Sequence, residues 1–178
     1  MNFLLRIRIK NGVSRMAATA LIIPAVIAAG CRGVPDQKAQ EDGKIATELG
    51  QVTAAVHAAG PGLGALSSRP DFIKLVRKFI APVRFLEDGS GYFFVYNTDG
   101  IVIAHAANKD LVGKNLYSLR DKTGKYFIQD KIKTAESGGG YVTYYWPEPK
   151  TKKVKLKKVY VEMIPGTDYL IGSGVYYQ

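Results

Sequence analysis

Cysteine, histidine and tryptophan are scarce in this chain of 178 residues, which has one Cys, two His and one Trp. A single Cys excludes an intrachain disulfide and any metal site built from several thiolates. The sequence has no C-x-x-C, H-E-x-x-H or G-x-S-x-G pattern, so haem attachment, zinc hydrolysis and the α/β-hydrolase nucleophile lack their residues. An enzyme using His105 as a base would need a paired acid or nucleophile, and none is visible. We therefore predict no catalytic residue, no metal, no cofactor and no enzymatic activity.

Acidic residues are also in the minority, because 15 Asp and Glu stand against 25 Lys and Arg, for a formal net charge of +10. A basic chain raises nucleic acid and anionic membranes as partners. The charge is unevenly placed, however. Residues 1–30 contain four basic residues and no acid, so the chain without them has a net charge of +6, and six lysines fall within residues 150–158.

The segment 16–30, MAATALIIPAVIAAG, carries no charge and follows a basic stretch. Its 15 residues are fewer than the roughly 20 that cross a bilayer as a helix, and Pro24 interrupts them. A basic region, a short apolar region and small residues before a cleavage point predict a secretory signal over residues 1–30. Ala28-Ala29-Gly30-Cys31 resembles the lipobox of bacterial lipoproteins, which implies that Cys31 is lipidated and becomes the first mature residue. A plain secretory signal followed by a chance Cys is the alternative.

Export sets the expected location and partners. We expect a lipid-anchored protein of the bacterial periplasm, or else a secreted soluble one. Arg32 follows Cys31 where an Asp would favour the inner membrane, so the outer membrane is preferred. An exported protein rarely meets nucleic acid, so we predict no nucleic-acid partner.

The mature chain is predicted to contain a tether over residues 31–43 and a single domain over residues 44–178. Apolar residues at i, i+4, i+7 and i+11 predict a helix from about residue 36 to residue 59. Gly60-Pro61-Gly62 is expected to end it. A second helix fits residues 70–86, with a kink or an early end at Pro82.

After Gly89 the pattern changes to strands. Residues 91–96 and 101–105 predict a hairpin around the turn Asn97–Gly100. A short helix is expected over residues 125–136. Three further strands are expected at 141–146, 154–163 and 169–176. The order predicts an α+β domain with a five-stranded antiparallel sheet and N-terminal helices packed against it.

These strands and turns resemble a single Cache domain, the extracytoplasmic relative of the PAS fold. The similarity covers roughly residues 70–177, with the pieces in order and at the expected spacings. They are Gly91–Tyr96, Thr98–Gly100, Ala104-His105, Leu111–Asn115, Asp121–Lys125, Gly139–Pro147, Lys157–Val161 and Asp168–Tyr176. The resemblance implies a small-molecule pocket on one side of the sheet, for short organic acids or amino acids. It also implies a role for His105, because a His occupies this position in the family.

The residues themselves point to a binding face. Lys157 shares a strand face with Val159, Val161 and Met163, where a charge is costly unless it meets an anion or reaches water. It is either a carboxylate clamp or a lysine that extends to solvent from a basic hairpin. His105 is either a ligand donor whose charge changes near neutral pH or a side chain bonded to the following loop. We expect pocket walls from Tyr144 and Trp146, with Phe94 and Tyr117 as further candidates.

We therefore predict an exported ligand-binding module that reversibly binds a short carboxylate and performs no chemistry. Only two residues follow Tyr176, so we expect a separate membrane sensor or transporter to carry the signal. The alternative is a structural lipoprotein whose first helix or lysine-rich hairpin docks to a protein or to anionic lipid. The stripe Ile45–Val56 could pair two copies as a homodimer or pack on its own sheet, and the sequence leaves both open.

Overall fold

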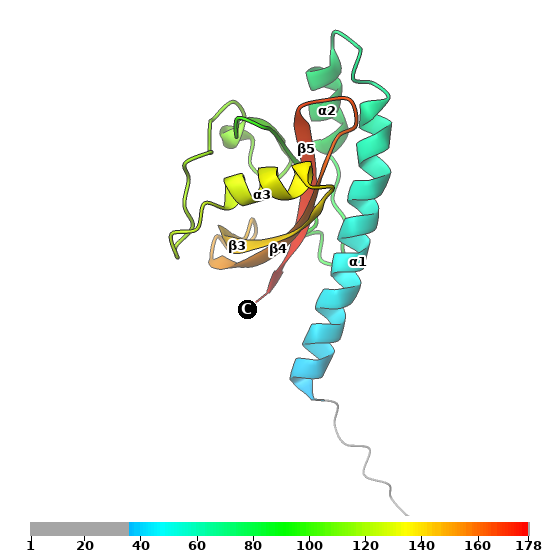
Figure 1. Ribbon diagram of the computed structural model, residues 1–178. Helices are drawn as coiled ribbons and strands as arrows, with labels where there is room; N and C mark the ends of the chain where they lie inside the picture. The colour runs from blue at the N-terminus through cyan, green and yellow to red at the C-terminus, as the bar shows by residue number, and fades with distance from the viewer. Residues whose placement is uncertain (1–35, 178) are drawn as a thin grey trace, which may run out of the picture. The chain divides into compact units, whose positions relative to one another are not determined.

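A computed structural model describes residues 36–177 of the chain (Figure 1). Residues 36–177 belong to one compact unit with two hydrophobic cores of its own, so we expect this unit to fold without the preceding residues. The predicted signal over residues 1–30 and the predicted lipidation at Cys31 lie outside the described residues. Within residues 36–177, no helix is both long and apolar enough to cross a membrane.

Three helices and five strands make up the domain. The helices are α1 (Gln37–Gly64), α2 (Phe72–Ile80) and α3 (Phe127–Glu136), with a short 3-10 turn, η1 (Lys109–Leu111). The strands are β1 (Phe94–Asn97), β2 (Val102–His105), β3 (Gly140–Pro147), β4 (Val154–Met163) and β5 (Tyr169–Tyr177).

The strands form one sheet in the order β2-β1-β5-β4-β3, and every neighbouring pair is antiparallel. The predicted α+β class with a five-stranded antiparallel sheet is therefore confirmed. The β1–β2 hairpin turns at Gly100, whose φ of 80° is a conformation that favours glycine. Its placement matches the turn expected from Asn97–Gly100.

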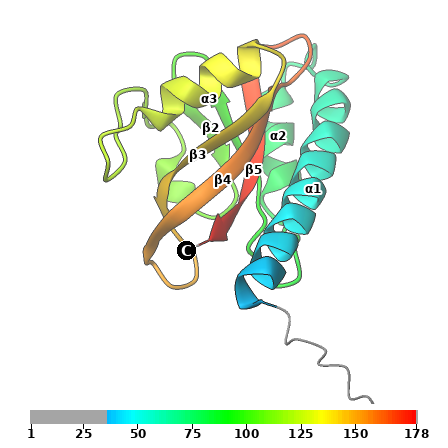
Figure 2. The same cartoon turned by 60° about the horizontal axis from the view of Figure 1, so that its bottom comes forward.

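The sheet is covered on both faces. Helices α1 and α2 pack on one face and α3 packs on the other, as Figures 1 and 2 show from two directions. Because side chains alternate along a strand, Phe93 and Val95 join the first core while Tyr92, Phe94 and Tyr96 join the second. This alternation separates a mixed, mainly aliphatic core under α1 from a core rich in aromatic residues under α3.

The expected break at Gly60-Pro61-Gly62 is wrong, because α1 continues through it to Gly64. The reason is packing. A Cβ on Gly60 would lie 2.6 Å from the Glu162 carboxylate, so glycine here lets the helix approach the sheet closely. Helix α1 also begins at Gln37, so most of the segment expected as a tether is helical. The second helix ends at Ile80, before Pro82, as the proline predicted.

The outer edge of β3 is capped by the loop Asp121–Lys125. Asp121 accepts hydrogen bonds from the backbone N–H groups of Thr123 (2.8 Å), Lys125 (3.1 Å) and Tyr145 (3.0 Å). Lys125 Nζ donates to the Thr143 carbonyl at 2.8 Å. These hydrogen bonds lower the pKa of Asp121 to about 2, although partial desolvation opposes them. The loop therefore occupies an edge that could otherwise pair with another chain.

Replacing Asp121 by Asn is expected to lower the free energy of unfolding by about 2 kcal/mol at pH 7, because an amide N–H would face the Tyr145 N–H. The folded pKa of Asp121 lies below the unfolded value of about 3.9. Its stabilisation is therefore complete above about pH 4 and is lost as the pH falls toward 2. Urea unfolding at pH 7 and at pH 2.5 measures the difference.

The matched control for this substitution is Asp130→Asn, which removes only a partly exposed pair with Lys125 at 3.4 Å. It should cost about 0–1 kcal/mol. Equal losses for the two variants would contradict the edge-capping role of Asp121.

Candidate ligand-binding site

An aromatic cluster lies between α3 and the sheet. Its rings come from β1, β3, β5 and α3 and from the segment just before β1. Phe127 of α3 stacks on Tyr144 of β3 with ring centroids 4.4 Å apart and planes 6° apart. The cluster comprises Tyr92, Phe94, Tyr96, Phe127 and Tyr144, with Trp146 and Tyr176 partly buried at its border. Phe94, Tyr144 and Trp146, expected as pocket walls, thus lie together on one face.

Lys157 of β4 projects into this cluster and is only 1% exposed. Its Nζ donates to the Tyr92 hydroxyl at 2.7 Å and lies 4.0 Å from the Tyr92 ring centroid. The side chain does not extend to solvent, so the snorkelling alternative is wrong. Burial lowers its pKa well below the usual range of a lysine.

A second buried lysine, Lys131 of α3, was not anticipated from the sequence. It is also 1% exposed, and its Nζ lies 4.2 Å from the Tyr144 ring centroid and 4.5 Å from that of Phe94. Burial lowers its pKa well below the usual range, and the charge of Lys157 lowers it further. A signal for it existed, because Lys131 is four residues after Phe127 on the inward stripe of the helix.

Neither lysine has an acidic partner. Among residues 36–177, no carboxylate lies within 4 Å of either ammonium group. The contacts are with ring faces and with the Tyr92 hydroxyl. Cation–π contacts offset only part of the cost of burying a charge. The arrangement therefore favours a small anion that would balance this charge.

His105 ends β2 beside the cluster, with its ring centroid 5.2 Å from that of Tyr92. Its Nδ1 accepts a hydrogen bond from the Asn108 N–H at 3.0 Å. Burial, together with the charges of Lys157 and Lys131, lowers its pKa to about 3. The expected change of charge near neutral pH is therefore wrong. The ring is neutral at pH 7, with its proton on Nε2, which can donate a hydrogen bond.

A cavity of about 430 Å³ opens beside the cluster. Tyr92, His105 and Trp146 line it, and Lys109 and Lys152 lie at its exposed rim with Asp110 and Glu148. The Lys157 ammonium contacts this lining through the Tyr92 hydroxyl.

Tyr117 lies away from this cavity. It is 41% exposed, and a Cβ on Gly100 would touch its backbone, so it packs against the β1–β2 turn. The structure thus brings together five of the six residues proposed for the ligand site and places Tyr117 elsewhere.

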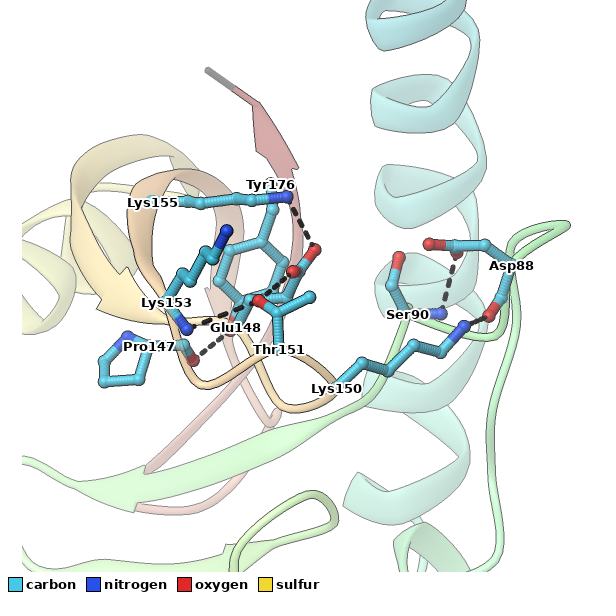
Figure 3. Close-up of polar contacts among 9 residues, drawn as sticks. All are labelled: Asp88, Ser90, Pro147, Glu148, Lys150, Thr151, Lys153, Lys155 and Tyr176. Atoms are coloured by element: carbon cyan, nitrogen blue, oxygen red, sulfur yellow. Dashed lines mark hydrogen bonds and ion pairs between the residues drawn. The ribbon is translucent and has the colours of Figure 1, made fainter.

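The β3–β4 hairpin forms one wall of the cavity. Figure 3 shows the polar contacts that hold this hairpin. Tyr176 donates to the Pro147 carbonyl at 3.2 Å, and its hydroxyl lies 2.9 Å from that of Tyr92. Glu148 pairs with Lys155 at 3.2 Å, and Lys150 bonds to the Asp88 carbonyl. A continuous hydrogen-bond chain therefore runs from Lys157 through Tyr92 and Tyr176 to the hairpin.

Comparison with known proteins identifies a matching family and relatives of this chain. A family model described as a Cache domain, dCache_2, matches residues 66–178. The sensor histidine kinase MctS of Rhizobium johnstonii is 37% identical over 86 residues, which are 48% of this chain and 19% of MctS. The methyl-accepting chemotaxis protein CtpM of Pseudomonas aeruginosa is 26% identical over 141 residues, which are 79% of this chain and 24% of CtpM. The chain spans between 16% and 24% of the length of such curated relatives.

Solved structures show the same fold. A methyl-accepting chemotaxis protein from Vibrio parahaemolyticus superposes with a TM-score of 0.67 at 26% identity, covering 78% of this chain and 95% of that one. A Cache chemosensory domain described for carboxylic acid recognition has a TM-score of 0.61 at 23% identity, covering 83% of this chain and 100% of that one. With the family model matching more than half of the residues, this chain is a member of the Cache domain family.

Proposed function

We propose that the protein is an extracytoplasmic sensor module that reversibly binds a small organic carboxylate at the aromatic cluster. The observation that carries the proposal is the pair of buried lysines, neither of which has an acidic partner within residues 36–177. Buried charges in proteins are normally paired. An anionic ligand would supply the missing partner at a site that already has fixed donors.

Each residue has a distinct role in this proposal. Lys157 would hold the carboxylate together with the Tyr92 hydroxyl, and His105 would donate from Nε2 to a second ligand oxygen. Phe94 and Tyr144 would enclose the apolar part of the ligand, and Trp146 would cover it from the cavity side. No step in this scheme breaks or forms a covalent bond.

The ligand would enter through the cavity beside Tyr92. Lys109 and Lys152 at its rim would attract an anion from solution. The related domain with reported carboxylic acid recognition supports this ligand class for the shared fold.

We further propose that residues 1–30 direct export and that a lipid on Cys31 anchors the domain in the periplasm. A separate membrane sensor or transporter would then read the ligand state. A second candidate is docking to anionic lipid. The exposed Lys150, Lys152 and Lys153 favour it, because their hairpin lies at the same end of the domain as the start of α1 (Figures 1 and 2).

The single tryptophan provides a first readout. Because Trp146 lines the cavity, titration with a bound carboxylate is expected to change its fluorescence emission and to give the dissociation constant. The indole is packed against Phe127 and Tyr144. The change in emission should saturate as the site fills. A ligand that binds by calorimetry but leaves the emission unchanged would place binding elsewhere.

A thermal-shift screen of residues 32–178 tests the proposed function. The panel contains acetate, propionate, pyruvate, succinate, matched amines and amino acids, at two salt concentrations. A ligand at 100 times its dissociation constant should add about 2.7 kcal/mol of stability. A shift by carboxylates but not by amines is expected. No shift by any carboxylate, with salt-sensitive binding to anionic vesicles, would overturn the sensor proposal in favour of lipid docking.

A further inference from the structure

Two ammonium groups flank a single ring in the aromatic cluster. Lys131 Nζ lies 4.5 Å from the Phe94 ring centroid, and Lys157 Nζ lies 5.8 Å from the same centroid. The two lysines come from α3 and β4, so the fold itself holds two basic groups of like sign in an apolar environment. Like charges this close disfavour simultaneous protonation.

The groups that face the lysines provide no negative charge. The titratable groups that β1, β2, β3, β5 and the segment before β1 direct toward the lysines are neutral at pH 7. Burial raises the pKa of Tyr92 to about 12 and also raises the pKa values of Tyr96, Tyr144 and Tyr176. Burial lowers the pKa of His105 to about 3. These facing groups are Tyr92 before β1, Tyr96 of β1, His105 of β2, Tyr144 of β3 and Tyr176 of β5.

Charged groups farther out do not change this balance. Arg84 adds a positive charge near His105, and its guanidinium donates to the Ala106 carbonyl. At the cavity rim, Asp110 and Glu148 are accompanied by Lys109 and Lys152, and Glu148 is already paired with Lys155. The site therefore has an excess of basic groups and no internal acid to balance them.

We propose that ligand binding at this cluster is coupled to proton uptake, so that the affinity for a carboxylate falls as the pH rises. The inference rests on the proposed function, because it assigns a regulation to the same site. A carboxylate beside Lys157 would stabilise the ammonium form of that side chain. The protein would then bind the ligand together with one proton taken from solvent.

The proton taken up on binding determines how the affinity for the ligand depends on pH. The free site holds Lys157 as an amine, and the occupied site holds an ammonium–carboxylate pair. The ligand carboxylate enters ionised, so the proton comes from water or buffer. Between the pKa of Lys157 in the free protein and that in the complex, the association constant should fall tenfold per pH unit. Outside that window the affinity should be constant.

Lys131 is coupled to the same event but is not expected to take up the proton. The charge of a protonated Lys157 lowers the pKa of Lys131, and both amino groups lie near the Phe94 ring. The pKa of Lys157 itself is lowered by burial. Lys131→Met is therefore expected to keep the uptake of one proton per ligand, and loss of proton uptake in this variant would contradict the assignment to Lys157.

Calorimetry of residues 32–178 with acetate, propionate and succinate between pH 6 and pH 9 tests the proposal. At one pH, titrations in HEPES and in Tris give the number of protons bound from the dependence of the heat on the buffer. About one proton per ligand and a tenfold loss of affinity per pH unit are expected. His57→Gln is the control, because His57 pairs with Glu162 on the opposite face of the sheet.

The outcomes distinguish a failure of the proton coupling from a failure of the proposed function. Binding that takes up no proton and keeps the same affinity from pH 6 to pH 9 overturns the proton coupling and leaves the proposed function standing. Binding of none of the acids at any pH overturns the proposed function, and the coupling with it. An NMR titration of the lysine side chains in the free protein is independent of ligand. If Lys131 and Lys157 both titrate near pH 10, the coupling is wrong.

Discussion

Replacing Lys157 by Met is expected to abolish carboxylate binding while leaving the free protein at least as stable as the wild type. Met matches the length and apolar body of the lysine, so the packing against Tyr92 and Tyr176 is kept. Loss of one partner of a buried charge pair should raise the dissociation constant about 100-fold or more. Calorimetry with the carboxylate panel measures the first effect, and urea unfolding measures the second.

The matched control for this substitution is Lys158→Met, on the same strand. Lys158 is half-buried and lies 5.0 Å above the Tyr141 ring, so it is not part of the aromatic cluster. We expect it to bind the carboxylates as the wild type does. If both variants lose binding equally, or if Lys157→Met unfolds the domain, then Lys157 is a structural residue and the clamp is wrong.

Replacing Lys131 by Met is expected to stabilise the free protein by about 1–4 kcal/mol. The lysine is 1% exposed and has no carboxylate partner within the described domain, so its burial opposes folding. The charge that Lys157 carries when it is protonated lowers the pKa of Lys131 further. A thioether can fill the same space beside the stacked rings of Phe127 and Tyr144 without that cost.

The pH dependence of this stabilisation has a definite sign. An unfolded lysine holds its proton below about pH 10.4, whereas the folded pKa of Lys131 is far lower. Unfolding therefore takes up protons, and wild-type stability should rise with pH. The gain from Lys131→Met should shrink between pH 6 and pH 9. A variant that is less stable than the wild type at pH 6 would contradict this account.

Most of the fold was predictable because its signals are local. The period-two alternation in residues 91–96 assigned Tyr92, Phe94 and Tyr96 to one face, and the structure places them in one core. The same reasoning put Lys157 on one face of its strand with Val159 and Val161, and the structure places these valines in the same core. Gly100 marked the hairpin turn because its positive φ demands a glycine.

The remaining features depend on contacts between distant segments. Helix α1 continues through Gly60 and Pro61 because Gly60 is buried against Glu162 and Ile171 of the sheet, and propensity alone cannot show that. The low pKa of His105 arises from burial and from lysines on two other elements. Lys131 was overlooked because a lysine on a short helix is usually solvated, although its position on the inward stripe was visible.

The hydrogen bonds that begin at Lys157 indicate how the domain would respond to a ligand. Lys157 is linked through Tyr92 and Tyr176 to Pro147, and the hairpin is linked through Lys150 to the loop at Asp88. A carboxylate that pulled Lys157 from Tyr92 would change the first bond of this chain. The proposed signal would then begin as a hydrogen-bond rearrangement at the cavity wall.

The most direct measurement is a crystal structure of residues 32–178 with the carboxylate that gives the largest thermal shift. The account predicts its carboxylate oxygens within hydrogen-bond distance of Lys157 Nζ and the Tyr92 hydroxyl. It also predicts the apolar part of the ligand against Phe94, Tyr144 and Trp146. A carboxylate bound outside the aromatic cluster, with the Lys157–Tyr92 bond unchanged, would contradict the central claim.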